Sequence, residues 1–240
     1  MPPQRDYDPD RAAGYRRRIV ITPEARISVA SLEDDFHHMR VTLRHDDCRV
    51  TEVGSETLRA PWNICPAAAV KLATDFTGAS LHAAAAGADK RLNCTHLYDL
   101  AVLAAAHAAD DMPTRYDVLV ADPQDAVVHA ELRRNGDALL HWVLEGNVLV
   151  EPMELAGIPL GGLRDWIGAL DGPMKEAARI LQWATFVAHG RAIPLGQQSD
   201  ASRMPPNCYT FQPDRAAHAV RSGLRHDFSQ SGRPLLAELE

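Results

Sequence analysis

The sequence lacks the features that mark most membrane, secreted and nucleotide-binding proteins. No stretch approaches the roughly 18 to 20 consecutive apolar residues of a bilayer-spanning helix, and the first residues hold no apolar segment typical of a signal peptide. G-x-S-x-G, P-loop and G-x-G-x-x-G motifs are missing too, which argues against a hydrolase elbow and a nucleotide cofactor. We therefore expect a cytoplasmic protein that needs neither a membrane nor a cofactor.

Positive charge is in short supply. The chain has 25 Lys and Arg against 32 Asp and Glu, a net charge of -7. Binding to nucleic acid needs a concentrated basic surface, so we expect no nucleic-acid partner. The run Arg16 to Arg18 falls within polar residues 1–20, which we expect to form a flexible N-terminal arm.

Cysteine is scarce and scattered. The four cysteines are Cys48, Cys65, Cys94 and Cys208, with no Cys-x-x-Cys pair. This is neither the density of a disulfide scaffold nor the spacing of a zinc ribbon, so we expect reduced thiols and no metal. Convergence of three of these cysteines with His37 and His96 on a metal ion stays open as an alternative.

What is present is enough apolar material for one core, since 46% of the 240 residues are hydrophobic. Strand-like alternation at Met39, Val41 and Leu43, followed by a polar turn at 45–47, predicts an N-terminal hairpin. Asn135-Gly136 predicts a type I′ turn between two further strands, and Gly146-Asn147 predicts a second turn. These strands form a central antiparallel meander.

Helical spacing predicts helices over residues 66–78, 94–109, 163–169 and 173–188, with Asn93 as the N-cap of the second. The order of strands and helices favours an α+β fold, in which an antiparallel sheet packs against several helices in a single domain. We expect residues 21–194 to form this core and residues 195–240 to form a C-terminal tail. The tail would pack on the core or cover a pocket.

The first group of candidate catalytic residues lies at the hairpin. If residues 35–43 form a regular strand, Asp35, His37 and Met39 share one partly buried face. Asp35 would then orient His37 as an acid/base unit, because burial and pairing move both pKa values toward the working range. The alternative is a strand end at which both side chains are solvated.

The second group lies at the start of the helix over residues 94–109. Unpaired N–H groups and the helix dipole would favour a thiolate at Cys94, keep His96 neutral and bind an anionic group such as a phenolate or carboxylate. Neutral His96 would be a competent base. The alternative is that Cys94 and its neighbours only cap and pack the helix start.

The third group lies in the tail, where residues 205–212 contain Tyr209 and Phe211 in an otherwise polar segment. Such a segment must dock somewhere. Tyr209 would cover a pocket as a general acid or hydrogen-bond donor; the alternative is simple aromatic packing.

Four segments together resemble the bacterial family catalogued as domain of unknown function 2889. They are Leu-Glu-Asp-Asp-Phe-His-His at 32–38, Cys-Pro-Ala at 65–67, Asn-Cys-Thr-His-Leu-Tyr-Asp-Leu at 93–100 and Asn-Cys-Tyr at 207–209. The Cys-Thr-His-Leu helix start is the most specific, and the resemblance covers roughly residues 19–212. It implies a γ-formaldehyde lyase that acts on lignin-derived phenylcoumaran or diarylpropane dimers and gives a stilbene.

Such a lyase needs no cofactor, because ionising the para-hydroxyphenyl ring and expelling the α-oxygen gives a quinone methide that acts as the electron sink. It needs a base, an acid and an apolar slot for a small aromatic substrate. The candidate acids and bases are Asp35, His37, His96, Tyr98 and Tyr209. The candidate substrate-binding residues are Phe36, Met39, Trp62, Cys94 and Trp142.

Two other functions stay open. The hairpin and the Cys-Pro-Ala helix start are similar, more distantly, to scaffold proteins for iron–sulfur cluster assembly, although a compact cysteine set is missing. A non-catalytic small-molecule binding module is the other. A homodimer is plausible for an enzyme of this size.

Overall fold

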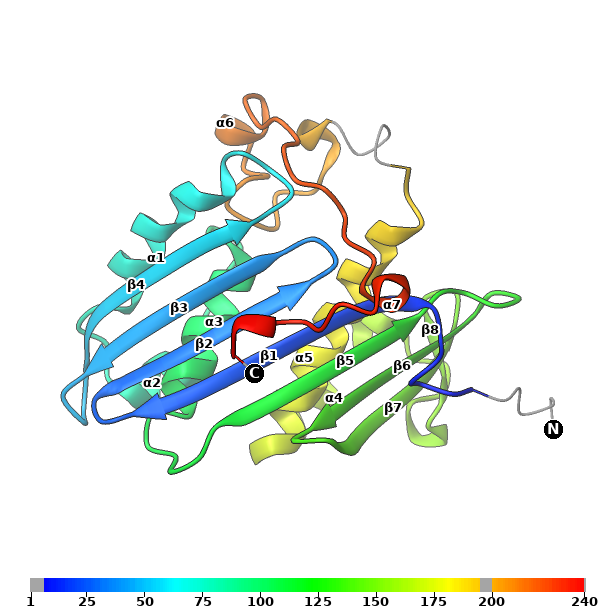
Figure 1. Ribbon diagram of the computed structural model, residues 1–240, viewed down its shortest axis with the longest axis horizontal. Helices are drawn as coiled ribbons and strands as arrows, with labels where there is room; N and C mark the ends of the chain where they lie inside the picture. The colour runs from blue at the N-terminus through cyan, green and yellow to red at the C-terminus, as the bar shows by residue number, and fades with distance from the viewer. Residues whose placement is uncertain (1–6, 195–199, 240) are drawn as a thin grey trace. The chain divides into compact units, whose positions relative to one another are not determined.

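The computed structural model describes residues 7–194 and 200–239 (Figure 1). Within these residues eight antiparallel strands follow the order β4-β3-β2-β1-β5-β6-β7-β8, accompanied by helices, so the predicted α+β class is confirmed. No described helix has the length and apolar character that a bilayer crossing requires. The described residues divide into two compact units. One comprises residues 19–115, 194, 200–226 and 236–239, and the other comprises residues 7–18, 116–193 and 227–235.

The unit that contains residues 19–115 is built on the strands β1 (Gly14–Glu24, from Ile19 onward), β2 (Ile27–Asp34), β3 (His38–His45) and β4 (Val50–Arg59). Met39, Val41 and Leu43 of β3 are fully buried, whereas the residues between them are half-buried. This period of two places one face of the strands in the core. The predicted N-terminal hairpin is therefore confirmed as β3 and β4.

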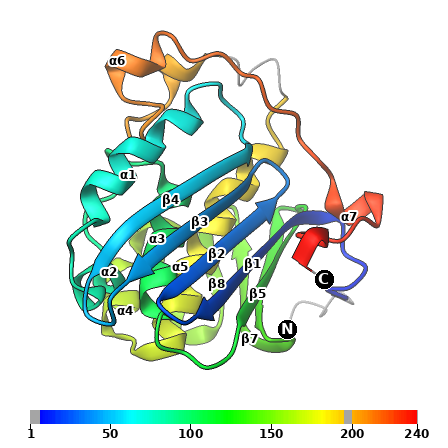
Figure 2. The same cartoon turned by 60° about the vertical axis from the view of Figure 1, so that its left-hand side comes forward.

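Three helices cover this core: α1 (Ala68–Phe76), α2 (Leu81–Ala86) and α3 (Thr95–Ala106). Helix α3 packs on β2 and β3, and α1 packs on β4 (Figure 2). Leu97, Leu100 and Ala101 of α3 are fully buried, as expected of a central helix. The helices predicted over residues 66–78 and 94–109 are thus confirmed as α1 and α3.

Residues 200–226 and 236–239 of the tail contribute to the same unit. The short helices η6 (Ala201–Arg203) and α6 (Pro213–Ala216) bring Ala201 and Ala216 against Trp62 and Cys65 in a small apolar cluster. Residues 195–199, the first of the predicted tail, lie outside the described residues. The tail from residue 200 to 226 therefore packs on the unit that contains β2 and α3.

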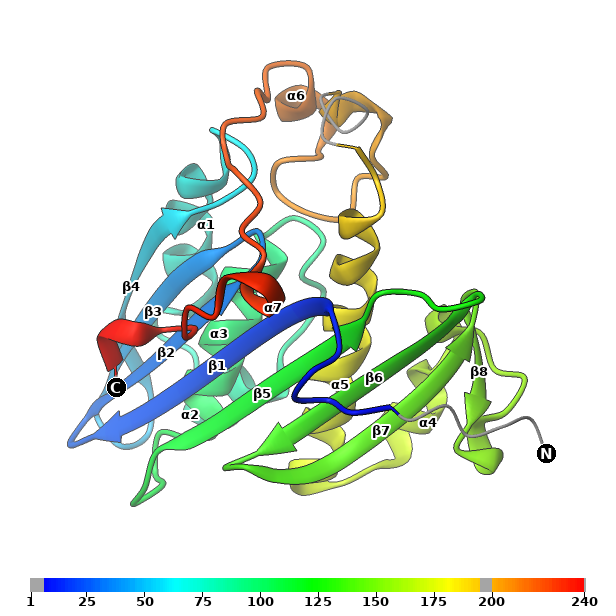
Figure 3. The ribbon, with the colours of Figure 1, turned by 45° about the vertical axis from the view of Figure 1, so that its right-hand side comes forward.

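The other unit contains β5 (Thr114–Ala121, from Tyr116 onward), β6 (Val127–Arg134), β7 (Asp137–Glu145), β8 (Val148–Glu151), α4 (Arg164–Ala169), α5 (Gly172–Ala188) and α7 (Phe228–Ser231). Asn135 and Gly136 have φ values of 53° and 96°, which confirms the predicted type I′ turn. Helix α5 packs on β6 and β7 (Figure 3). The predicted meander and the helices over 163–169 and 173–188 are confirmed.

The prediction of a flexible arm over residues 1–20 is wrong for residues 14–20, which lie in β1. Tyr15 and Ile19 are buried, and Arg17 between them is only 4% exposed. Arg18 donates from Nε to Oδ1 of Asp117 at 2.7 Å. Three consecutive arginines disguised the strand, because Arg17 lies on the buried face together with Tyr15 and Ile19. Residues 1–6 of the predicted arm lie outside the described residues.

The prediction of a regular strand over residues 35–43 is also wrong at its start. Strand β2 ends at Asp34 and β3 begins at His38, so residues 35–37 form a tight turn. The N–H of Asp34 donates to the carbonyl of His37 at 2.8 Å and closes the turn. Asp35 and His37 therefore do not share a strand face.

Candidate functional site

The turn between β2 and β3 is organised by the buried carboxylate of Asp34. Its Oδ1 accepts the backbone N–H groups of Phe36 at 2.8 Å and His37 at 2.7 Å. An aspartate that accepts N–H groups two and three residues ahead is a common way to stabilise a turn. Asp34 is 0% exposed, so these bonds hold its carboxylate in one orientation inside the protein.

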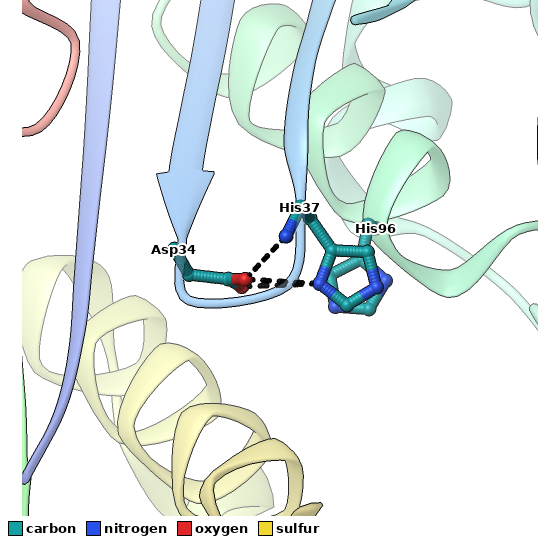
Figure 4. A group of neighbouring side chains, drawn as sticks. All are labelled: Asp34, His37 and His96. Carbon is teal, nitrogen blue, oxygen red and sulfur yellow. Dashed lines mark hydrogen bonds and ion pairs between the residues drawn. The ribbon is translucent and has the colours of Figure 1, made fainter. Parts of the chain in front are cut away.

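The same carboxylate binds the ring of His37. Nδ1 of His37 lies 3.0 Å from Oδ1 and 3.3 Å from Oδ2 of Asp34 (Figure 4). A carboxylate is an acceptor, so Nδ1 donates, and in the neutral ring the lone pair lies on Nε2. The predicted orienting role of Asp35 is wrong: the carboxylate at hydrogen-bonding distance from His37 belongs to Asp34.

The second imidazole of the site is His96, in the first turn of α3. Its ring lies face to face with that of His37, with centroids 3.8 Å apart and planes 28° apart (Figure 4). His37 is buried and His96 is half-buried, which places the pair at the boundary of the core. The structure thus brings together His37 and His96, two of the predicted catalytic residues.

Arg59, at the end of β4, holds the turn through hydrogen bonds to its backbone carbonyls. Its Nη1 donates to the carbonyl of Asp35 at 3.0 Å, and its Nη2 donates to the carbonyls of Asp34 at 2.7 Å and His37 at 3.2 Å. Nη2 also donates to Oε1 of buried Glu33 at 3.2 Å. One guanidinium therefore binds three carbonyls of the turn, those of Asp34, Asp35 and His37. Sequence reasoning missed Arg59 because no local pattern links residue 59 to residue 34.

C-terminal residues bind the same turn. The N–H of His226 donates to the carbonyl of Asp35 at 2.8 Å. The N–H of Leu236 donates to Oε2 of Glu33 at 2.8 Å. The turn is thereby held from β4 and from two points of the C-terminal segment.

The other predicted catalytic residues occupy structural positions. The hydroxyl of Tyr98 accepts the N–H of Ala88 at 2.7 Å, and its ring packs edge-to-face on Phe76. The N–H of Tyr209 donates to the carbonyl of Asn93 at 2.8 Å, which docks the tail at the start of α3. The Tyr209 ring carries the guanidinium of Arg215 at 4.0 Å from its centroid.

The predicted substrate-binding residues are divided. Phe36 lies edge-to-face with His37 at 6.3 Å between centroids, so it contributes to the site. Met39 is fully buried in the core. Trp142 belongs to the other unit, where it is fully buried and packs on Trp166 at 6.2 Å. Trp62 is almost buried but borders a cavity.

That cavity has a volume of about 340 Å³ and adjoins the turn. Its lining includes Trp62, Arg59 and His226, and the last two bind the backbone of the turn that carries His37. The complete lining is Thr57, Leu58, Arg59, Ala60, Trp62, Asn63, Pro66, Ser222, Gly223, Leu224 and His226. It contains aromatic and polar groups but no carboxylate.

The start of α3 differs from the prediction. Cys94 is the N-cap, and predicted N-cap Asn93 instead donates from Nδ2 to Asp75 at 2.8 Å. Burial, reinforced by the neighbouring Cys65 thiol, raises the pKa of Cys94 to about 12. The expected thiolate is therefore wrong, because the cost of burying a charge exceeds the help of the helix dipole. Burial also raises the pKa of Cys208 to about 11.

These thiol environments predict selective alkylation. At pH 7.5 iodoacetamide should modify exposed Cys48 while Cys94 stays unmodified, because a raised pKa keeps the Cys94 thiol protonated and burial excludes the reagent. Peptide mass spectrometry over time measures the modification at each site. Protein unfolded in urea is the control, in which all four cysteines should react. Rapid modification of Cys94 in the folded protein would contradict the buried N-cap.

Asp34, His37 and His96 are also the one group of three potential metal ligands that gathers among the described residues, with ligand atoms within 4.8 Å of one another. Two imidazoles and a carboxylate suit a divalent transition metal. Lone pairs lie in the ring planes, however, so two stacked rings direct them along nearly parallel lines. A metal would require one ring to turn, whereas proton transfer uses the rings as they stand.

No model of a known protein family matches the chain, and no curated protein matches it either.

Proposed function

We propose that the protein is a cofactor-independent lyase that releases formaldehyde from the γ-hydroxymethyl group of a lignin-derived aromatic dimer. The observation that carries the acid/base part is the hydrogen bond from Nδ1 of His37 to buried Asp34, with His96 stacked beside it. The resemblance of the chain to the domain of unknown function 2889 family supports the choice of substrate. Membership in that family is itself a prediction.

The reaction balances without an oxidant. Ionisation of the para-hydroxyl group expels the α-oxygen of the phenylcoumaran, which takes up a proton, and leaves a quinone methide. Removal of the γ-hydroxyl proton then lets the Cβ–Cγ bond break and release formaldehyde. The electron pair of the broken Cβ–Cγ bond forms the stilbene double bond between Cα and Cβ, and the quinone methide returns to an aromatic phenolate. The protein has only to move protons and hold the two rings.

In this proposal His37 is the base, because Asp34 fixes the Nδ1–H tautomer and leaves the Nε2 lone pair for a proton. His96 is the second proton carrier, because its ring lies against that of His37 at 3.8 Å between centroids. Phe36 and the cavity bordered by Trp62 supply aromatic surface next to the turn. A volume of about 340 Å³ lies at the lower end of the range for small-molecule pockets. Tyr98 and Tyr209 remain predicted participants, whereas the orienting role predicted for Asp35 belongs to Asp34.

A second candidate function is metal binding at Asp34, His37 and His96, which the composition and proximity of their ligand atoms favour. The sequence had suggested a metal site formed by cysteines with His37 and His96. Here the two histidines are kept as ligands, and the carboxylate of Asp34 replaces the cysteines. A cytoplasmic location and a homodimer are part of the first proposal.

The test is to incubate metal-analysed protein with a phenylcoumaran that bears a γ-hydroxymethyl group. Formaldehyde and stilbene, assayed by derivatisation and ultraviolet absorbance, should appear in equal amounts, and chelator-treated protein should keep this activity. Failure to form either product from phenylcoumaran and diarylpropane substrates would refute the lyase. Activity that chelation removes and added metal restores would select the metal-dependent form of the site.

A further inference from the structure

A pair of histidines lies on neighbouring strands of the unit that contains β5 to β8. His129 is on β6 and His141 on β7, and the strand register sets Glu131 opposite His141 and Val143 opposite His129. The two histidines are therefore diagonal neighbours on one face of the ladder. Their side chains are half-buried and exposed respectively, so the pair is open to solvent.

The two rings meet edge to edge. Nδ1 of His129 lies 3.2 Å from Nε2 of His141, the ring planes differ by 11°, and the centroids are 5.3 Å apart. In nearly coplanar rings the lone pairs of the facing nitrogens lie in a common plane, as in a planar chelating ligand. Two nitrogens each about 2.0 to 2.1 Å from a metal ion stand roughly 3.2 Å apart when they occupy adjacent positions around it. The spacing needed for chelation is therefore already present.

Tyr7 and Glu151 also lie near the His129 and His141 pair. The ring of Tyr7 stacks over His129 at 4.3 Å and over His141 at 5.2 Å between centroids. Its hydroxyl oxygen is buried and has no hydrogen-bond partner among the described residues. Glu151 on β8, paired with Val143, adds negative charge that acts on His129. The negative charge of Glu151 near His129 favours a cation, and the Tyr7 ring stacks over both imidazoles.

We infer that His129 and His141 bind one divalent transition-metal ion of the zinc, nickel and copper class, through Nδ1 of the first and Nε2 of the second. Water completes the coordination. When no metal is bound, the same separation accommodates an N–H···N hydrogen bond between the rings. The site is separate from the Asp34, His37 and His96 cluster and does not depend on the proposed lyase reaction.

The test is calorimetric titration of Zn²⁺ into tag-free full-length protein and into His129→Asn and His141→Asn variants. Each variant should lose this binding event or bind at least about tenfold more weakly, as expected when a metal ligand is lost. His82→Asn, on the exposed surface of α2, is the matched control and should bind as the unaltered protein does. Circular dichroism checks that all three variants are folded.

A second measurement keeps the inference testable if Zn²⁺ also binds elsewhere. In protein with ¹⁵N-labelled histidine, Zn²⁺ should shift the side-chain resonances of His129 and His141. Unaltered resonances at both residues, or equal affinity of both variants and the unaltered protein, would overturn the inference. A shift at His37 and His96 alone would assign the binding to the other cluster and overturn it equally.

Discussion

The His37→Gln protein should turn over the phenylcoumaran substrate about 10²- to 10⁴-fold more slowly than the unaltered protein, the usual range for loss of a general base. Glutamine can still donate to Asp34, so the turn should survive, but an amide nitrogen cannot accept the γ-hydroxyl proton. Formaldehyde release under saturating substrate measures the effect on kcat. The loss should appear mainly in kcat, because His37 acts in proton transfer rather than in holding the rings.

The matched control for this substitution is His82→Gln, which removes an exposed imidazole from α2 of the same unit. It should leave turnover unchanged. The companion variant His96→Gln should also be slow, since the stacked ring is the second proton carrier in the proposal. If His37→Gln retains turnover within about twofold, His37 is not the base, whatever the fate of His96.

Secondary structure in this chain was largely predictable because it is specified by local patterns. Asn135-Gly136 adopts the positive φ values that a type I′ turn requires, and the spacing of Leu97 and Leu100 identifies α3. Strand β5 was missed because Val118, Leu119 and Val120 are all buried, so the alternation that marks a half-buried strand is absent. Local patterns predict helices and strands well where one face is exposed to solvent and the other is buried.

The site was only partly predictable, because adjacent acids are indistinguishable in a sequence. Asp34 and Asp35 differ by one position, and the assumption of a regular strand selected Asp35 as the partner of His37. The turn bonds to Phe36 and His37 reverse that choice. The sequence identified His37 and His96 as candidate acids and bases. Their stacking is a contact between residues 59 positions apart, and no local sequence pattern predicts such a contact.

Electrostatic reasoning from the sequence failed where burial mattered. A helix N-terminus lowers the pKa of an accessible thiol, yet the Cys94 thiol is buried next to Cys65, and its pKa is raised instead. Arg16 to Arg18 suggested a solvated run, yet β1 buries Arg17. In both cases the tertiary environment decides the outcome, and a sequence does not show how deep a residue lies.

Asp34→Ala should destabilise the protein by about 2 to 4 kcal/mol, because it leaves two buried backbone N–H groups and the His37 ring without their acceptor. Urea unfolding followed by circular dichroism measures the change in the free energy of unfolding. The closest comparison is Asp46→Ala, since Oδ1 of Asp46 accepts the N–H groups of Cys48 at 3.1 Å and Arg49 at 2.7 Å in the same pattern on an exposed turn. There water replaces the lost acceptor, so the loss should be much smaller.

Asp34→Asn separates the structural role of Asp34 from its role in catalysis. The asparagine oxygen can still accept the N–H groups of Phe36 and His37, so most of the stability should be retained. The amide carries no negative charge to stabilise a protonated His37, so turnover should fall although the protein is folded. A folded Asp34→Asn protein with full activity would show that Asp34 only shapes the turn. Equal losses in the free energy of unfolding for Asp34→Ala and Asp46→Ala would instead show that burial does not increase the stabilisation that the Asp34 hydrogen bonds provide.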